Sequence, residues 1–315
     1  MLRYNLDIQP EPAAVKINFN DRLIFLGSCF SEHISSRLGA LHFRVASQPV
    51  GIVFNPVSLC KPFIVARESG NYKETDLLYN QDTWYSKYHH GMYSAHDKAA
   101  LLTQINAAQA EFVSTLKEAE HLFITFGSAW VYSYRETGEI VANCHKIPQS
   151  AFEKRLLQPH EIISAWTEVL NYIYSVNEKI SVVFTVSPVK HLRDGAVENT
   201  LSKSILLYSV YELVRQFPQA GYFPSYELVN DDLRDYRFYE PDGAHPNQLA
   251  IDYVFEKFCS AHMDAITSAY IRDMEKHLRL MSHKPIRQQG REYEQFLLQI
   301  ENSRTNIEKL YGRSL

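Results

Sequence analysis

Two stretches at opposite ends of the chain carry residue types that cooperate in acyl transfer. Ser28 follows the apolar run 23–26 and Gly27, while Asp242 and His245 stand three residues apart in a stretch that favours a turn. A serine becomes a nucleophile when an imidazole accepts its proton and a carboxylate orients that imidazole. The Asp-x-x-His spacing places carboxylate and imidazole on one tight turn, so only the fold can bring Ser28 to them. Ser28 has a second reading, compatible with the first, as the N-cap of the helix that follows it.

The elements that must position these residues alternate between strand and helix. Apolar and β-branched runs predict strands at residues 22–27, 43–46, 121–127, 181–186 and 221–229. Helical spacing predicts helices at residues 29–38 with Gly39 as C-cap, 98–118, 159–176, 197–217, and from Pro246 as the first helical position. This alternation predicts an α/β fold with a parallel sheet covered on both faces. Ser28 would then lie at the carboxyl end of a strand, where such sheets bind ligands.

Residues 61–98 show poor periodicity and are interpreted as an insertion over the active face. Aromatic and histidine side chains crowd into it: Trp84, Tyr85, Tyr88, His89, His90, Tyr93 and His96. They could contact a substrate or simply pack the insertion onto the domain, and the sequence leaves both readings open. The sequence therefore divides into an α/β domain at 1–260, with this insertion, and a helical extension at 261–315. The extension could serve as an arm for homo-oligomer formation.

Composition narrows the classes of partner and cofactor. The 315 residues are 45% hydrophobic and 22% charged, with a formal net charge of -4, which gives no reason to expect nucleic acid or an anionic membrane as partner. The four cysteines form no Cys-x-x-Cys pair, and the histidines of 89–96 have no established zinc spacing, so no metal and no cofactor are predicted. The first residues lack the pattern of a signal peptide, which favours the cytoplasm.

Several stretches together resemble one known family. They are Gly27-Ser28-Cys29-Phe30-Ser31, Thr125-Phe126-Gly127-Ser128-Ala129-Trp130, Asn143-Cys144-His145-Lys146, Val186-Ser187-Pro188-Val189-Lys190-His191, Asp235-Tyr236-Arg237-Phe238-Tyr239 and Asp242-Gly243-Ala244-His245-Pro246. In this order they resemble the GSCFA family, which is grouped with the SGNH, or GDSL-like, hydrolases. The resemblance runs from about residue 23 to 258 and leaves the C-terminal helices outside.

The resemblance implies a three-layer α/β/α sandwich with a central parallel sheet of flavodoxin-like order. It also implies that Ser28 is the nucleophile, His245 the base and Asp242 its partner, with the Ser28 backbone N–H as an oxyanion donor. One departure concerns the oxyanion. Where SGNH hydrolases carry Gly-x-Asn, this chain has Gly127-Ser128-Ala129, so the amide donor is absent at Ala129. Losing one such donor typically costs about two to three orders of magnitude in rate.

Other groups could replace that donor or contact substrate. Asn55, Asn143 and His145 are candidates because each lies in a loop after a strand, and Gly51 could supply the backbone donor that the family resemblance implies. Gly127 and His191, at strand ends, are further candidates. Polar residues in loops are also common turn formers, so each has a structural reading as well. Cys29, beside the nucleophile, is interpreted as a small buried filler, although a thiol is the better nucleophile in isolation.

These features predict a serine esterase that removes or transfers a small acyl group. The aromatic residues of 84–93 suggest a small-molecule or carbohydrate ester, such as an O-acetylated sugar. A glycan-binding domain that kept the fold with little or no catalysis is the alternative. Transfer of the acyl group to a sugar acceptor is a third reading.

Overall fold

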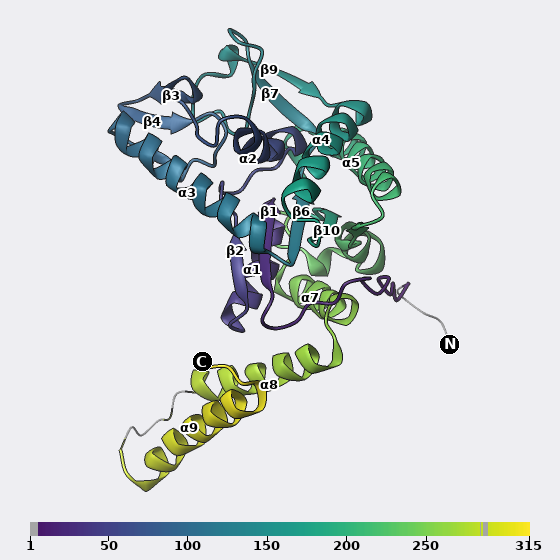
Figure 1. Ribbon diagram of the computed structural model, residues 1–315. Helices are drawn as coiled ribbons and strands as arrows, with labels where there is room; N and C mark the ends of the chain where they lie inside the picture. The colour runs from purple at the N-terminus through teal and green to yellow at the C-terminus, as the bar shows by residue number, and fades with distance from the viewer. Residues whose placement is uncertain (1–5, 284, 286–288) are drawn as a thin grey trace.

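The computed structural model describes residues 6–283, 285 and 289–315, and its centre is a five-stranded parallel sheet (Figure 1). The strands are β1 (Arg22–Gly27), β2 (Arg44–Ser47), β6 (His121–Phe126), β10 (Ser181–Val186) and β11 (Ala220–Tyr222). Their order is β11-β10-β6-β1-β2, all pairs parallel. Counted within this sheet alone the order is 5-4-3-1-2, so the predicted flavodoxin-like order is confirmed.

Helices cover both faces of the sheet, which gives three layers. One core cluster joins the sheet to α2 (Pro56–Glu68), α3 (Lys98–Glu118), α4 (Pro159–Val176) and α5 (Ala196–Gln216). The other joins it to α1 (Cys29–Ala40) and α7 (Gln248–His262). Successive residues of a strand face opposite sides, so Ile24 lies in the first cluster and Phe25 in the second. This two-sided burial explains why β1, β6 and β10 are apolar almost throughout.

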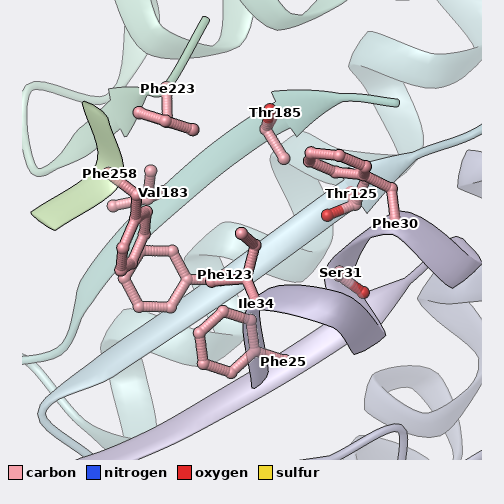
Figure 2. A pocket seen from close by; sticks show the side chains of 10 residues that line it. All are labelled: Phe25, Phe30, Ser31, Ile34, Phe123, Thr125, Val183, Thr185, Phe223 and Phe258. Carbon is pink, nitrogen blue, oxygen red and sulfur yellow. The ribbon is translucent and has the colours of Figure 1, made fainter. Parts of the chain in front are cut away.

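A small apolar cavity lies between the sheet and the α1/α7 layer. Figure 2 shows the ring of Phe123 between those of Phe25 and Phe258, with Ser31 and Thr125 nearer the carboxyl ends of the strands. Phe25 stacks on Phe123 with ring centroids 4.7 Å apart. The volume is about 20 Å³, close to that of one water, and such apolar cavities tend to stay dry.

The boundaries of the insertion differ from the prediction at residues 61–98. Residues 56–68 form helix α2, which packs against α4 as part of the domain. Its pattern was hard to read because Pro62 lies inside the helix. The remainder folds into a small antiparallel sheet of β3 (Leu77–Asn80), β4 (Thr83–Ser86) and β5 (Ser94–Ala95), against which α3 packs.

A second small sheet was missed from the sequence. It consists of β7 (Trp130–Tyr134), β8 (Ile140–Val141) and β9 (Phe152–Leu156) in the order β8-β7-β9, in a region where the sequence predicts no strand. The strand predicted at 221–229 is also shorter, because β11 ends at Tyr222 and a turn of helix with a π-helical segment, Leu228–Asp232, follows.

Two helix ends are corrected as well. Helix α1 continues through Gly39 to Ala40, so Gly39 is not its C-cap. Helix α7 begins after Asn247, whose side chain accepts hydrogen bonds from the N–H groups of Leu249 and Ala250. Pro246 therefore precedes the N-cap and is not the first helical residue.

The C-terminal extension forms two helices, α8 (Ala265–Ser282) and α9 (Arg291–Tyr311), which project from one end of the molecule (Figure 1). Tyr270 anchors α8, stacking on Phe19 at 4.8 Å and donating a hydrogen bond to the Leu41 carbonyl at 3.0 Å. The predicted role of this arm in oligomer formation stays a prediction. No helix within the described ranges is long and apolar enough to span a membrane.

Candidate active site

Ser28 lies at the corner between β1 and α1, as the sequence predicted. It occupies the N-cap position of α1, but its side chain makes no capping hydrogen bond. The residue is 1% exposed, and its Oγ has no hydrogen-bond partner among the described residues. Gly27 makes the corner possible, since its φ is +126° and an added Cβ would lie 2.1 Å from the Thr125 carbonyl oxygen. Ser28 is thus a buried hydroxyl that its own helix does not use.

Asp242 and His245 form the local pair that their spacing predicts. His245 Nδ1 lies 2.6 Å from Asp242 Oδ2, while Asp242 Oδ1 accepts the backbone N–H groups of Ala244 at 2.8 Å and His245 at 3.0 Å. These backbone hydrogen bonds, followed by the one from the imidazole, lower the pKa of Asp242 to about 2. The carboxylate is therefore ionised at neutral pH and holds the ring so that Nε2 points away from it.

The imidazole of His245 interacts electrostatically with two other histidines, His33 on α1 and His191 after β10. The pKa of His33, on the second turn of α1, is lowered by burial and further by the nearby His245. His191 is affected by His245 in the same way. On the other side, the Lys190 N–H donates to the Ala244 carbonyl at 3.1 Å. The structure contains no hydrogen bond between Ser28 and His245, both of which lie in its described part.

The backbone N–H groups considered as oxyanion donors all have partners in this structure. The Ser28 N–H donates to the Thr125 carbonyl at 3.2 Å, that of Gly51 to Gln48 at 2.7 Å, and that of Gly127 to Phe54 at 2.8 Å. Each would have to exchange its partner to bind an oxyanion. Ala129 is buried and its own N–H donates to Ser202 Oγ at 2.8 Å.

The predicted polar candidates make structural hydrogen bonds. Asn55 caps α2, because its Oδ1 accepts the Ser58 N–H at 2.7 Å. Asn143 Oδ1 accepts the His145 N–H at 2.9 Å. His145 itself is buried, with Nε2 at 2.7 Å from the Ser86 carbonyl and its ring stacked on Tyr85 at 4.7 Å. Burial lowers the pKa of His145. His145 therefore points toward the insertion, whereas Asn55 and Asn143 line a cleft.

That cleft, here called the strand-end cleft, has a volume of about 680 Å³. Residues that follow the carboxyl ends of β6 and β10 line it, together with the loop before α2 and the second small sheet; they include Phe54, Asn55, Ser128, Trp130, Asn143 and His191. His191 Nε2 is buried without a partner within the described part of the chain. Burial, with the charges of Lys203 and His245, lowers the pKa of His191 to about 4, so the ring is neutral at pH 7.

Lys203 is a residue of this region that the sequence analysis missed. It is 1% exposed, and its Nζ donates to the carbonyls of Gly127 and Ser187, both at 2.7 Å. Burial lowers its pKa to about 7. A signal was present in the sequence, because Lys203 shares the apolar stripe of α5 with Leu206 and Val210.

Cys29 and the histidines of the insertion do not add a second reactive centre. Burial raises the pKa of the Cys29 thiol, which agrees with a filler rather than a nucleophile. His89 Nδ1 lies 2.6 Å from Ser86 Oγ, and His96 Nδ1 lies 2.7 Å from the Asp82 carbonyl. Among residues 6–283, 285 and 289–315, no group of three or more histidine, cysteine or acidic side chains could hold a metal ion.

Comparison with known proteins supports the resemblance seen in the motifs. The GSCFA family matches residues 22–258. No curated protein matches the chain. Among solved structures, the chain is similar to a carbohydrate esterase family 3 protein from Talaromyces cellulolyticus, at 7% identity and a TM-score of 0.35 over 81% of this chain and 99% of that one. It is also similar to the acetyl xylan esterase Est2A from Butyrivibrio proteoclasticus, at 9% identity and a TM-score of 0.40 over 78% and 64% of the two chains. With three quarters of its length matched and the family's motifs in order, the chain belongs to the GSCFA family.

Proposed function

We propose that this protein is a serine esterase that removes or transfers a small acyl group, with Ser28 as nucleophile, His245 as base and Asp242 as its partner. The observation that carries the proposal is the Asp242–His245 pair, 2.6 Å apart, whose imidazole interacts electrostatically with His33 of the helix that begins after Ser28. Membership of the GSCFA family supports it.

The expected reaction has two halves. Ser28 Oγ attacks the ester carbonyl carbon while its proton moves to His245 Nε2, and the C–O bond to the alcohol breaks as that proton passes to the leaving oxygen. Water, or a sugar hydroxyl in the transferase reading, then attacks the acyl-Ser28 ester and restores the free serine. Because Ser28 Oγ is covered and does not contact His245, substrate entry must open the site and draw the two side chains together.

Turnover of p-nitrophenyl acetate and labelling by a fluorophosphonate probe test this proposal together. Wild type should hydrolyse the ester and carry the probe on Ser28. Ser28→Ala and His245→Ala should each lower kcat by about three orders of magnitude or more. Ser150→Ala and His160→Ala, at two exposed positions, serve as matched controls. Equal rates in all five proteins, or labelling at Cys29, would contradict the assignment.

A second candidate function is glycan binding with little or no catalysis. The buried, unpartnered Ser28 Oγ and the engaged N–H groups of Gly51 and Gly127 favour it. In that case acetylated oligosaccharides should bind wild type and Ser28→Ala with equal affinity in calorimetry, with no turnover in either protein.

A further inference from the structure

The strand-end cleft lies beside the two segments that carry the proposed catalytic residues, although Ser28 and His245 do not themselves line it. Phe54 lines the cleft, and the N–H group of the preceding residue, Val53, donates to the Gly27 carbonyl at 3.0 Å, next to Ser28. The Lys190 wall of the cleft donates to the Ala244 carbonyl, within the turn that holds His245. A ligand in the cleft would therefore extend from an ester positioned between Ser28 and His245.

The cleft carries a strong local excess of positive charge. Four cationic side chains line it, Lys146, Lys154, Lys190 and Arg193, against the single carboxylate of Asp194. The whole chain has a formal net charge of -4, so this cluster does not reflect a generally basic protein. A concave surface lined by one sign of charge concentrates ligands of the opposite sign.

Two of the four cations already have partners, and two do not. Lys154 pairs with Asp194, and the Lys190 ammonium lies 3.7 Å from the centre of the Tyr239 ring. Lys146 and Arg193 are exposed and form no ion pair with a carboxylate of residues 6–283, 285 and 289–315. Their charges are thus available to a ligand.

The cleft also contains groups that suit a sugar ring. Trp130, on β7, lines it with the Lys154 ammonium 4.7 Å from the ring centre. The partly exposed His191 has a buried Nε2 without a hydrogen-bond partner in the described part of the chain. A sugar ring can pack against an aromatic side chain, and its hydroxyl groups can form hydrogen bonds with polar atoms that lack a partner.

We propose that the strand-end cleft binds an anionic sugar, with Lys146 and Arg193 holding its carboxylate or phosphate group. This inference rests on the proposed function, since it names the substrate class of the same site. The preferred ester would be an acylated acidic sugar, whose charged group lies in the cleft while its acyl group reaches Ser28.

Matched esters test the inference. Acetylated methyl glucoside is the neutral substrate, acetylated methyl glucuronide adds a carboxylate, and acetylated glucose 6-phosphate adds a phosphate. Wild type should show a kcat/KM about tenfold or more higher for at least one anionic ester, because a charge-assisted hydrogen bond contributes about that much binding. The ester for which the preference is found identifies which anionic group the cleft binds.

The double variant Lys146→Gln/Arg193→Gln should bring the ratio of anionic to neutral kcat/KM close to one, mainly through KM. Arg44→Gln/Lys117→Gln removes one exposed Arg and one exposed Lys away from the cleft and should keep the wild-type ratio. Raising the salt concentration should lower the ratio in wild type only. Ester turnover with no preference, or a preference that survives in the double variant, would overturn this inference and leave the esterase assignment intact.

A binding measurement separates the two proposals. Methyl glucuronide and glucose 6-phosphate carry no ester, and their binding to Ser28→Ala can be followed by tryptophan fluorescence because Trp130 lines the cleft. Binding that is lost in the cleft double variant supports the anion site even if no ester is hydrolysed. Absence of binding for both sugars, together with equal kcat/KM for all esters, rejects it.

Discussion

The Lys203 ammonium is buried at the carboxyl ends of β6 and β10, where it donates to the main-chain carbonyls of Gly127 and Ser187. No carboxylate in the described part of the chain pairs with it. Burial disfavours the charged form and lowers the pKa of Lys203 to about 7. The side chain joins the loops that follow two neighbouring strands, and both loops line the strand-end cleft.

Lys203→Met tests the importance of this link. The substitution leaves two buried carbonyls without their donor, at about 1–3 kcal/mol each, and removes a buried charge that partly offsets the loss. We expect the free energy of unfolding to fall by about 2 kcal/mol in urea titrations at pH 6. Lys117→Met, at an exposed position of α3, should change it by no more than about 0.5 kcal/mol. Unchanged or higher stability of Lys203→Met would show that the two hydrogen bonds contribute nothing net.

Asp242→Asn tests the orientation of His245. An amide in place of the carboxylate favours the wrong tautomer of the ring, so kcat for p-nitrophenyl acetate should fall about 10³- to 10⁴-fold. Because the pKa of Asp242 is about 2, the loss should be similar at every pH above about 4. Rates measured from pH 5 to 9 check this, and a variant with wild-type kcat would exclude Asp242 from the proposed mechanism.

At the scale of single residues, the sequence could identify reactive side chains but not the groups that they contact. Ser28, Asp242 and His245 could be selected from spacing and family resemblance. The N–H groups of Gly51 and Gly127 already donate hydrogen bonds to other carbonyls. These contacts depend on how the loops fold and meet, and no local sequence pattern encodes that.

Among the elements, α2 connects the insertion to the site through its N-terminus. Asn55 caps it, and Trp166 on α4 donates to the Pro56 carbonyl at 3.0 Å.

Long helices with regular spacing could be predicted closely, and α3 and α4 begin and end at the predicted residues. Helix α2 could not, because Pro62 interrupts its pattern. Strands of two to five residues, as in the two small sheets, are too short to show a period.

Asn55→Ala separates the capping role of Asn55 from a catalytic one. Loss of the cap should lower the free energy of unfolding by about 0.5–2 kcal/mol, and Asn55→Asp should largely restore it because aspartate also caps well. If Asn55 only caps, esterase activity should follow stability. A loss of about 100-fold in kcat in both variants, with Asn55→Asp stable, would instead assign the amide to the oxyanion.

For the whole molecule, histidines whose pKa is lowered by burial contribute to the response to acid. Burial is the main cause that lowers the pKa of His191 to about 4 and those of His89 and His262 to about 3. The unfolded chain binds these protons near pH 6.5 while the folded chain does not. The contribution of these three groups to stability is therefore full above pH 6.5 and falls as the pH drops toward 4.

His262→Phe tests this dependence with little loss of packing, since His262 stacks on Phe258 at 4.7 Å. The variant should lose stability less steeply between pH 6.5 and 4, by up to about 1.4 kcal/mol per pH unit, the contribution of one proton. Urea unfolding at several pH values measures the slope. His160→Phe, at an exposed site, should leave the slope unchanged; equal slopes in wild type and His262→Phe would show that His262 is protonated without cost.

The architecture as a whole could be predicted because alternating buried strands and amphipathic helices admit few arrangements. The arrangement of the C-terminal helices could not, since α8 and α9 are held by side-chain contacts such as Tyr270 to Leu41 that leave no pattern in the sequence.

The order of the sheet has a consequence for how the protein is made. Strand β1 is synthesised before both of its neighbours, and one of them, β6, follows nearly a hundred residues later. Until residues 121–126 have been synthesised, the apolar strand that carries Ser28 keeps an open edge, and open edges recruit other chains. The Asp242–His245 turn follows later still. A nascent chain, or one truncated before β6, is therefore prone to aggregate while β1 lacks this partner strand.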